Sequence, residues 1–303
     1  MRYLGAEALR AALPPSLARR AIEGAFAAIA EGALEGPVRT SFAVAEGSSL
    51  LMPAVSRAHL GLKVLHLRSQ NPAHGLPAIV GEFFLYLRAT GELLAVLDGV
   101  ELTGLRTAAL AGHATALLAP SGAREGAIIG AGQQGYYQAR ALCEAAPIQR
   151  LRIWNRTPGR AAALAHRLRQ ELPAVEISIA RDPAAAVADA QAVTLATASD
   201  RPLLRLADVP EEIHLNAMGA YRPDMAELAP DLLAGATQLL VDDVQGALAE
   251  AGDLLQAAAA GKVSLDALRT PWHASQPRSG ITVFKSVGAA VFDLAVAEAA
   301  LGQ

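Results

Sequence analysis

The chain has 303 residues, of which 52% are hydrophobic and 18% are charged, and its formal net charge is −3. This composition is typical of a globular protein with one large or two moderate domains, and the weakly negative charge gives no basis for binding nucleic acid or an anionic membrane. No apolar run approaches the roughly 20 residues of a membrane span. The single cysteine, Cys143, excludes an internal disulfide framework. We therefore expect a cytoplasmic protein.

The first 119 residues mix helical and strand-like patterns. Apolar spacing predicts an amphipathic helix over 16–31. A second helix is expected in "LTGLRTAALAGHATALLAP", with Thr103 as its N-cap and Pro120 as its stop. Between these helices the sequence predicts strands at 39–45, 48–53, 61–68, 78–88 and 92–97. This segment is therefore expected to be an α+β domain.

From residue 126 onward, strands and helices alternate. "GAIIGAG" reads as a buried strand, 134–146 as a helix and 150–155 as a second strand, after which Thr157 and Pro158 open another helix. Further short apolar strands are expected in "VEISIA", "QAVTLAT", "EIHLNAMG" and "TQLLVDD". This alternation predicts an α/β fold with a Rossmann-type, doubly wound parallel sheet over 120–275. The apolar C-terminal helix, within 276–303, is expected to complete the domain formed by 1–119.

The turn after the first of these strands reads "GAGQQG" and has the spacing G-x-G-x-x-G. Gly130 would permit the tight turn, Gly132 would let backbone amides approach a pyrophosphate, and Gly135 would allow close packing of the helix. The phosphates would lie at the positive end of the helix that starts near Gln133. Because a strand precedes the motif and a helix follows it, we favour dinucleotide binding over a chance group of glycines.

The end of the second strand should carry an acid if the cofactor is NAD, because the acid binds the ribose 2′-hydroxyl. This chain has "WNRT" there, in which Arg156 can pair with a 2′-phosphate. The sequence therefore predicts a preference for NADP(H), with NAD(H) possible. A surface arginine without a ligand is the alternative.

Two basic residues, Arg106 and Lys63, are candidates for contact with the substrate. Arg106 is expected in the first turn of its helix, where a cation opposes the helix dipole unless an anion such as a carboxylate binds there. Lys63 lies among apolar residues in "LGLKVLHL", where desolvation would lower its pKa. The alternatives are an arginine that reaches solvent or a nearby Glu, and a strand lysine whose ammonium reaches the surface. No residues have metal-ligand spacing, so no metal is expected.

In its sequence motifs the chain resembles the ornithine cyclodeaminase/mu-crystallin family. The matching segments are "VRTSF…LLMPA", "GLKV…N…GLPA", "ATGELLAVLDG…LTGLRTAAL", "IIGAGQQG", "RIWNRT", "HLNAMGAYRPDMAEL" and "TVFKSVGAAVFDLA". They follow in order over nearly the whole chain. "LLAVLDG", "RIWNRT" and "GAYRPD" look more like the mu-crystallin branch, whose members reduce ketimines with NADPH. The resemblance implies a homodimer formed by the domain built from both chain ends.

The resemblance also implies roles for single residues. Arg39 and Arg106 would hold the substrate carboxylate, Met52 would line the pocket, and Lys63 would be the acid/base at the reacting carbon and nitrogen. The segment "FKSVG" would approach the nicotinamide. The predicted cofactor-binding residues are Gly130, Gly132, Gln133, Gln134, Gly135, Asn155, Arg156, Thr157, Lys285 and Ser286.

Two positions depart from the cyclodeaminase pattern. Ala78 replaces a threonine beside the substrate, and Tyr221 replaces the aspartate that handles the substrate amine. The alternative for Tyr221 is that it packs on the cofactor ribose while another acid, such as Asp224, reaches the amine.

Three functions follow from the resemblance. The leading one is NADP-dependent hydride transfer at the Cα–N bond of a small imino or amino acid, either reduction of a cyclic ketimine such as pyrroline-2-carboxylate or dehydrogenation of the alanine type. The second is an NAD-dependent ornithine cyclodeaminase, which forms proline and ammonia. The third is a non-catalytic NADPH-dependent binder of small ligands, against which the retained Arg39, Lys63 and Arg106 argue.

Overall fold

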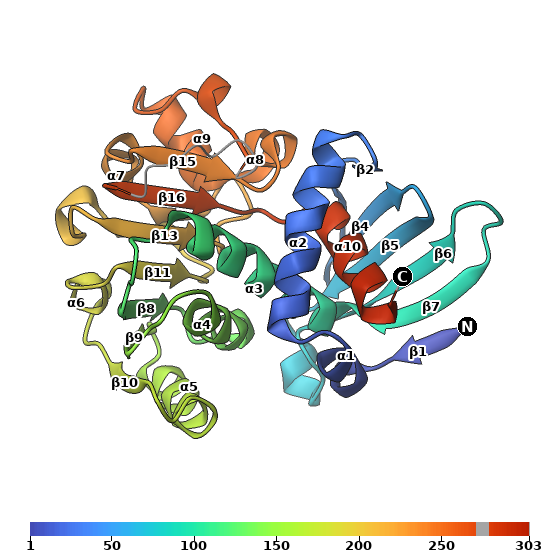
Figure 1. Cartoon of the computed structure of the whole chain (residues 1–303), viewed down its shortest axis with the longest axis horizontal. Helices are drawn as coiled ribbons and strands as arrows, with labels where there is room; N and C mark the ends of the chain where they lie inside the picture. Colours follow the sequence, from blue (N-terminus) through green and yellow to red (C-terminus); the bar gives the residue numbers. More distant parts are fainter. Residues whose placement is uncertain (271–278, 303) are drawn as a thin grey trace. The chain divides into compact units, whose positions relative to one another are not determined.

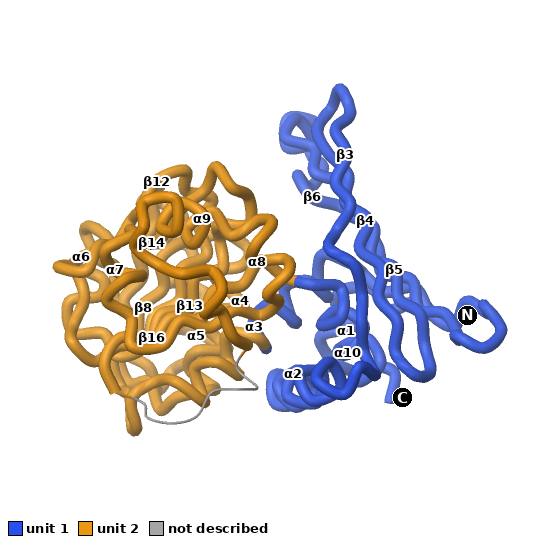
Figure 2. Tube along the Cα trace, turned by 90° about the horizontal axis from the view of Figure 1, so that it is seen from above, with its two compact units in different colours: residues 1–109, 289–303 blue, residues 110–288 orange. Residues whose placement is uncertain are grey.

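The computed structural model describes residues 1–270 and 279–302, and the chain forms two compact units (Figures 1 and 2). Unit 1 comprises Met1–Ala109 and Ala289–Gln303, and unit 2 comprises Leu110–Gly288. Residues 110–119 and 279–288, which the sequence placed in the first domain, belong to unit 2. The predicted boundary at 275/276 lies outside the described residues.

Unit 1 is built on a mixed sheet in the order β1-β7-β6-β5-β4-β2, with β3 paired to β4. The long strands are antiparallel neighbours, and β1 runs parallel to β7. All five strands predicted for this segment are present. The strands are β1 (Arg2–Leu4), β2 (Leu34–Glu35), β3 (Thr40–Val44), β4 (Gly47–Ser56), β5 (His59–Leu67), β6 (Ile79–Leu87) and β7 (Leu93–Asp98).

Three α-helices lie wholly within the described part of unit 1: α1 (Ala6–Ala12), α2 (Pro15–Ala30) and α10 (Ala290–Leu301). The C-terminal helix α10 packs against α2 and against strands β4 and β5, as the sequence predicted (Figure 1). The ring of Phe26 on α2 contacts that of Phe292 on α10, with 5.0 Å between their centroids. Apolar residues of α10 therefore bury the core face of the sheet.

Helix α3 (Gly99–Leu118) begins five residues earlier than the sequence predicted. The Asp98 carboxylate accepts hydrogen bonds from the backbone N–H groups of Val100 and Glu101, at 3.0 and 2.8 Å, and is the capping group. Thr103 lies inside the helix, where its hydroxyl donates to the carbonyl of Gly99 at 2.7 Å. The prediction of Thr103 as N-cap is wrong, and Arg106 consequently lies beyond the first turn.

Unit 2 contains a parallel seven-stranded sheet in the order β10-β9-β8-β11-β13-β16-β15. The chain runs outward from β8 to β9 and β10, then returns to the other side of β8 with β11. This is the doubly wound arrangement, so the predicted fold class is confirmed. The strands are β8 (Glu125–Ile129), β9 (Arg150–Trp154), β10 (Glu176–Ile179), β11 (Ala192–Leu195), β13 (Ile213–Ala217), β15 (Gln238–Val241) and β16 (Ile281–Lys285).

The connections of unit 2 cover the sheet. A small separate sheet pairs β12 (Asp200–Leu204) with β14 (Ala226–Leu228). The helices are α4 (Gln133–Ala145), α5 (Pro158–Glu171), α6 (Pro183–Val187), α7 (Pro230–Ala234), α8 (Val244–Glu250) and α9 (Gly252–Ala259). In the described part of the chain, no helix is both long and apolar enough to cross a membrane.

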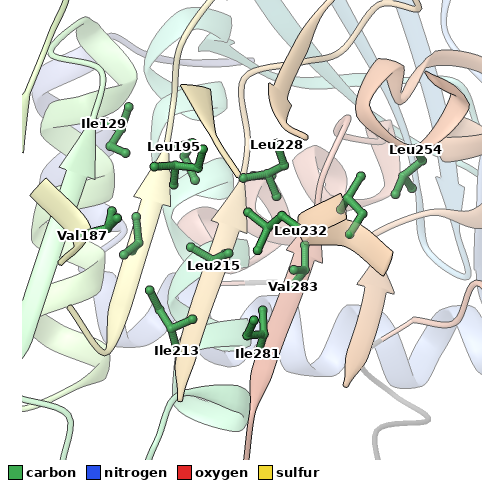
Figure 3. Packing of buried hydrophobic residues seen from close by; sticks show 14 of the residues in the cluster. Ile129, Val187, Leu195, Ile213, Leu215, Leu228, Leu232, Leu254, Ile281 and Val283 are labelled. Atoms are coloured by element: carbon green, nitrogen blue, oxygen red, sulfur yellow. The ribbon is translucent and has the colours of Figure 1, made fainter. Parts of the chain in front are cut away.

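The core of unit 2 is aliphatic, because helices cover its parallel strands. Figure 3 shows side chains of neighbouring strands packed over the sheet, among them Ile129, Leu195, Leu215 and Val283. This packing ends at the carboxyl edge of the strands, where the glycine turn and the loops after β11 and β13 lie. The core therefore sets the positions of the loops at the edge where doubly wound folds bind ligands.

Candidate active site

Unit 1 contains a buried cluster of charged side chains around Lys63. The Lys63 ammonium donates to Oδ2 of Asp293 at 2.6 Å and to the hydroxyl of Thr103 at 3.2 Å. The other carboxylate oxygen of Asp293 accepts a hydrogen bond from Nε of Arg106 at 3.1 Å. The side chains of Lys63 and Asp293 are at most 1% exposed. One carboxylate therefore bridges two cations inside the unit.

Three elements bring this cluster together. Lys63 lies in the middle of β5, directly opposite Met52 on β4 and Phe83 on β6, so the three side chains share the buried face of the sheet. Arg106 comes from α3, and Asp293 comes from the first turn of α10. Because the strands alternate strictly between faces, the position of Lys63 in β5 directs its ammonium into the unit rather than to solvent.

The environment makes Lys63 able to exchange a proton near neutral pH. Burial, the largest effect, lowers the pKa of Lys63 from 10.5 to about 7. The Asp293 carboxylate opposes this effect, whereas the charges of Arg106 and Arg39 lower the pKa further. The burial of the Lys63 side chain agrees with the sequence prediction of a desolvated lysine and excludes the alternative in which the ammonium reaches the surface.

The cluster has an excess of positive charge for an anion to balance. Arg106 uses only Nε on Asp293, and its two terminal nitrogens have no partner among the described residues. The helix-dipole argument for Arg106 is wrong, because the residue lies inside α3 and is neutralised in part by Asp293. A bidentate contact to a carboxylate is nevertheless open to its terminal nitrogens.

Arg39 and Met52 lie in the same unit. Arg39 directly precedes β3, is half-buried, and is close enough to influence the pKa of Lys63. Met52 is buried opposite Lys63. The sequence reasoning missed Asp293, which is one of two acids in the mostly apolar "AVFDLAVAEAAL" and had no feature that set it apart from Glu298. Carboxylate binding by Arg39 and pocket lining by Met52 stay predictions.

Unit 2 carries the glycine turn at the end of β8. Gly130 has a φ of 112°, which favours glycine, and a Cβ on Gly135 would lie 2.1 Å from the carbonyl oxygen of Gly130. Around Gly132, at the N-cap of α4, a Cβ would meet nothing within 4 Å. The turn is therefore tight where the helix packs and open at the helix N-terminus, next to Gln133 and Gln134, so it fits a bound pyrophosphate.

The residues after β9 hydrogen-bond to this turn and include the basic Arg156. Asn155 accepts a hydrogen bond from the N–H of Ala131 at 2.9 Å and donates to the carbonyl of Thr157 at 3.0 Å. Thr157 occupies the predicted N-cap position of α5, although its side chain makes no capping hydrogen bond. The exposed Arg156 has no side-chain partner in the part of the chain that the structure describes.

A cavity of about 500 Å³ borders the turn between α4 and α5. Arg160 and Arg167 line it together with Gly132 and Gln133. The Arg167 guanidinium lies 3.4 Å from the centre of the Tyr136 ring and pairs with Glu171, so its charge is already engaged. The side chain of Arg160 has no such partner among the described residues. The surroundings of the turn are therefore electropositive.

The segment "FKSVG" is more deeply buried than expected. The Lys285 ammonium is 1% exposed and lies 2.6 Å from the carboxylate of Asp253, inside unit 2. Ser286 donates its hydroxyl to Asp242 at 2.6 Å. The Lys285 ammonium is therefore engaged inside unit 2, and contacts of Lys285 and Ser286 with a cofactor stay predictions. The approach of the segment to the nicotinamide stays a prediction.

The two residues considered for the substrate amine lie after β13. Tyr221 is half-buried against the aliphatic core of unit 2. The exposed Asp224 forms two hydrogen bonds with the guanidinium of Arg222, at 2.9 and 3.0 Å. The Asp224 carboxylate is therefore engaged at the surface.

The sequence from residue 10 to residue 301 matches the ornithine cyclodeaminase/mu-crystallin family. The chain belongs to this family. The resemblance drawn from its motifs is thus confirmed, and the match spans both units.

Two curated members give the degree of similarity. The chain is 34% identical to the Delta(1)-pyrroline-2-carboxylate reductase of Bacillus cereus over 276 residues, which cover 86% of this chain and 84% of that protein. It is also 34% identical to the ketimine reductase mu-crystallin of Mus musculus, with 88% and 85% covered.

Solved structures of the family share the whole fold. The Delta(1)-pyrroline-2-carboxylate reductase of Thermococcus litoralis, in complex with NADH and L-proline, matches with a TM-score of 0.93, 28% identity and coverage of 100% of this chain and 97% of that chain. An archaeal alanine dehydrogenase dimer with bound NAD matches with a TM-score of 0.91, 27% identity and coverage of 100% and 95%.

Proposed function

We propose that the protein is an NADP-dependent reductase of small cyclic imino acids, of which pyrroline-2-carboxylate is the leading substrate. The observation that carries this proposal is the buried Lys63–Asp293–Arg106 cluster, whose lysine has a pKa of about 7. The relatives that act on imino acids with a nicotinamide cofactor support the reaction class. The test is NADPH consumption with a panel of cyclic imino acids, and oxidation of alanine or proline by NADP⁺ checks the reverse direction and the alanine-type alternative.

The two arginines account for the carboxylate of the substrate. Arg106 is held by Asp293 through Nε, so its terminal nitrogens point in a fixed direction and lose little freedom when they bind an anion. Arg39 adds a second positive charge near the same lysine. A substrate carboxylate would reduce the excess of positive charge that Lys63, Arg106 and Arg39 have over Asp293.

Lys63 accounts for the proton. Reduction of an imine requires a hydride at carbon and a proton at nitrogen, and a bound nicotinamide cofactor supplies the hydride. A lysine with a pKa of about 7 can donate the proton at neutral pH and regain it from solvent. Asp293 and Thr103 hold the ammonium at a defined position. A protein that only bound its ligand would not require a buried lysine of this kind.

Ornithine cyclodeamination needs a base that collects a proton from the substrate amine. Asp224, the acid that the sequence offers, is exposed and bonded to Arg222. Tyr221 carries a phenol hydroxyl, and a phenol is a poorer base than a carboxylate at neutral pH. These two observations favour the reductase over the cyclodeaminase.

We expect Arg156 to select NADP(H) over NAD(H). Its side chain is exposed and unpaired in the described structure, at the strand end where the ribose of the adenosine half lies in doubly wound folds. A lost charge-assisted contact costs on the order of 1.5–3 kcal/mol, so wild type should prefer NADPH roughly tenfold to hundredfold. Arg156→Asp should reverse the preference.

The measurement is the Kd of NADPH and of NADH for both proteins by titration calorimetry. Arg152→Asp is a matched control, because it makes the same charge change nearby, on β9, but replaces an arginine already paired with Asp189. Equal affinity of wild type for the two cofactors would contradict the role of Arg156.

We also propose that two copies form a dimer through the sheet of unit 1. The face opposite the helices is apolar but only half-buried, and its central residues are Leu62, Val64, Phe84 and Val96. On the helix-covered face, by contrast, Lys63, Phe83 and Leu97 are fully buried. An apolar sheet face of this kind needs a partner, and a second copy is consistent with the dimeric archaeal relative.

Replacing Leu62 with Asp should convert the dimer to a monomer, because the charge would be buried in the apolar interface. Light scattering coupled to size exclusion measures the mass. Ile179→Asp is the control, since Ile179 is an exposed aliphatic residue of unit 2. A monomeric wild type, or a dimer that survives Leu62→Asp, would refute this interface.

A further inference from the structure

A buried carboxylate at the edge of unit 2 joins two loops. Glu227, on β14, is completely buried. Its Oε1 accepts hydrogen bonds from the backbone N–H and the hydroxyl of Thr197, at 2.7 and 2.8 Å. Its Oε2 accepts a hydrogen bond from the N–H of Gly219 at 2.7 Å. Glu227 therefore connects the loop after β11 with the loop after β13.

These loops lie beside the glycine turn. Gly130 approaches the loop after β11 so closely that a Cβ would lie 2.5 Å from the carbonyl oxygen of Ala196. Gly219 approaches the same loop, since a Cβ there would lie 2.0 Å from the carbonyl oxygen of Thr197. The turn and the two loops are thus in direct contact along the carboxyl ends of β8, β11 and β13.

The position of this contact indicates which half of the dinucleotide the loops face. In doubly wound sheets a dinucleotide crosses the carboxyl edge where the strand order reverses, which here is between β8 and β11. The half with β8, β9 and β10 binds one nucleotide, and the half with β11 and β13 receives the other. Because the glycine turn and Arg156 belong to the first half, the loops joined by Glu227 belong to the nicotinamide half.

We propose that Glu227 is a positioning residue that holds the loops after β11 and β13 in the shape that receives the nicotinamide half of the cofactor. This inference rests on the proposed function. Glu227 does not touch the reacting atoms. It acts through Thr197 and Gly219, whose backbone it fixes.

The backbone of Glu227 is in turn held by Asp253, which forms an ion pair with Lys285. Asp253, at the start of α9, accepts hydrogen bonds from the backbone N–H groups of Glu227 and Leu228. Lys285 forms an ion pair with the other oxygen of Asp253 at 2.6 Å. Burial raises the pKa of Glu227, and the Lys285 charge opposes this shift. Both oxygens of Glu227 accept only N–H or O–H donors, so the hydrogen bonds select the ionised carboxylate.

The arrangement predicts a specific effect of Glu227→Gln. The amide keeps the size of the side chain but has only one acceptor oxygen, so its NH₂ group must face the N–H of Gly219 or the donors of Thr197. One loop should therefore be released, whereas the glycine turn and Arg156 should be unaffected. The affinity for the nicotinamide half should fall, and the affinity for the adenosine half should not.

The experiment compares the Kd of the full cofactor with that of its adenosine fragment by titration calorimetry. The pairs are NADPH with 2′,5′-ADP and NADH with ADP, and the pair that wild type binds more tightly is used. We expect Glu227→Gln to weaken the full cofactor about tenfold or more and to leave the fragment within about twofold. Thr194→Val is the control, because it removes a buried hydroxyl of β11 that accepts a hydrogen bond from Asn216 and none from Glu227.

A second pair of variants covers the case in which Glu227→Gln does not fold. Thr197→Val removes only the hydroxyl bond to Glu227 and should weaken the full cofactor selectively, whereas Thr197→Ser keeps the hydroxyl and should restore the affinity. Equal weakening of cofactor and fragment, or no weakening of either, would overturn the positioning role. A wild type that binds neither NADPH nor NADH would instead refute the proposed function.

Discussion

Replacing Lys63 with methionine should lower the rate of imine reduction at least about a hundredfold at pH 7, the usual contribution of a general acid. Methionine fills a similar volume but has no proton to donate. Asp293 keeps Arg106 as a partner in this variant, so the fold should persist. The measurement is kcat for NADPH oxidation at saturating imino acid, with the Kd of NADPH as a check that cofactor binding is intact.

Lys63→Arg distinguishes a titrating group from a fixed charge. A guanidinium keeps the positive charge beside Asp293 but does not release a proton in this pH range, so this variant should lose activity to a similar extent. Lys262→Met removes an exposed lysine of unit 2 and should be fully active. Near-normal turnover of Lys63→Arg would reduce Lys63 to a structural charge.

The pH profile should report the same group. Reduction requires protonated Lys63, so kcat/KM for the imine should fall as pH rises through about 7. Oxidation of the amino acid requires the neutral amine of Lys63 and should rise over the same range. Both limbs should be absent from the residual activity of Lys63→Met.

Replacing Asp293 with asparagine should have the second largest effect, because one carboxylate neutralises two buried cations. Asp293 raises the pKa of Lys63, so its loss should lower that pKa and move the falling limb of the reduction profile to more acidic pH. The loss of activity should therefore be at least about tenfold at pH 8 and smaller at pH 6.

The same change should destabilise unit 1. Removing one partner of a buried ion pair costs about 3–5 kcal/mol, since the remaining charges are uncompensated. Denaturant unfolding of wild type, Asp293→Asn, Lys63→Met and the double variant measures this coupling. The double variant should recover part of the stability that Asp293→Asn loses. A reduction profile that Asp293→Asn leaves unmoved would show that Asp293 does not control Lys63.

Much of the fold could be predicted because its signals are local. The "GAGQQG" turn lies between a buried strand and a helix, and Gly130 adopts the positive φ that its position requires. Lys63 could be selected because an isolated lysine in an apolar strand is unusual. The alternation of strands and helices from residue 126 specified the doubly wound sheet for the same reason.

The errors concern information that is not local. Both Asp98 and Thr103 are suitable caps for α3, and only the structure shows that the helix begins after Asp98. The partner of Lys63 is 230 residues away in the chain, and an acid in the first turn of a helix is ordinary, so Asp293 carried no clear signal. The insertion of β16 between β13 and β15, which buries Lys285, depends on the tertiary fold.

The most direct test of the reductase is the rate of NADPH oxidation with pyrroline-2-carboxylate, measured in parallel with pyrroline, which lacks the carboxylate. Lys63 supplies the proton in both cases, whereas only the first compound can bind Arg39 and Arg106. We predict rapid NADPH oxidation with pyrroline-2-carboxylate, slow oxidation with pyrroline, and little release of ammonia from ornithine at catalytic NAD. Equal rates with the two imines would contradict the carboxylate site, and efficient ammonia release without imine reduction would identify a cyclodeaminase instead.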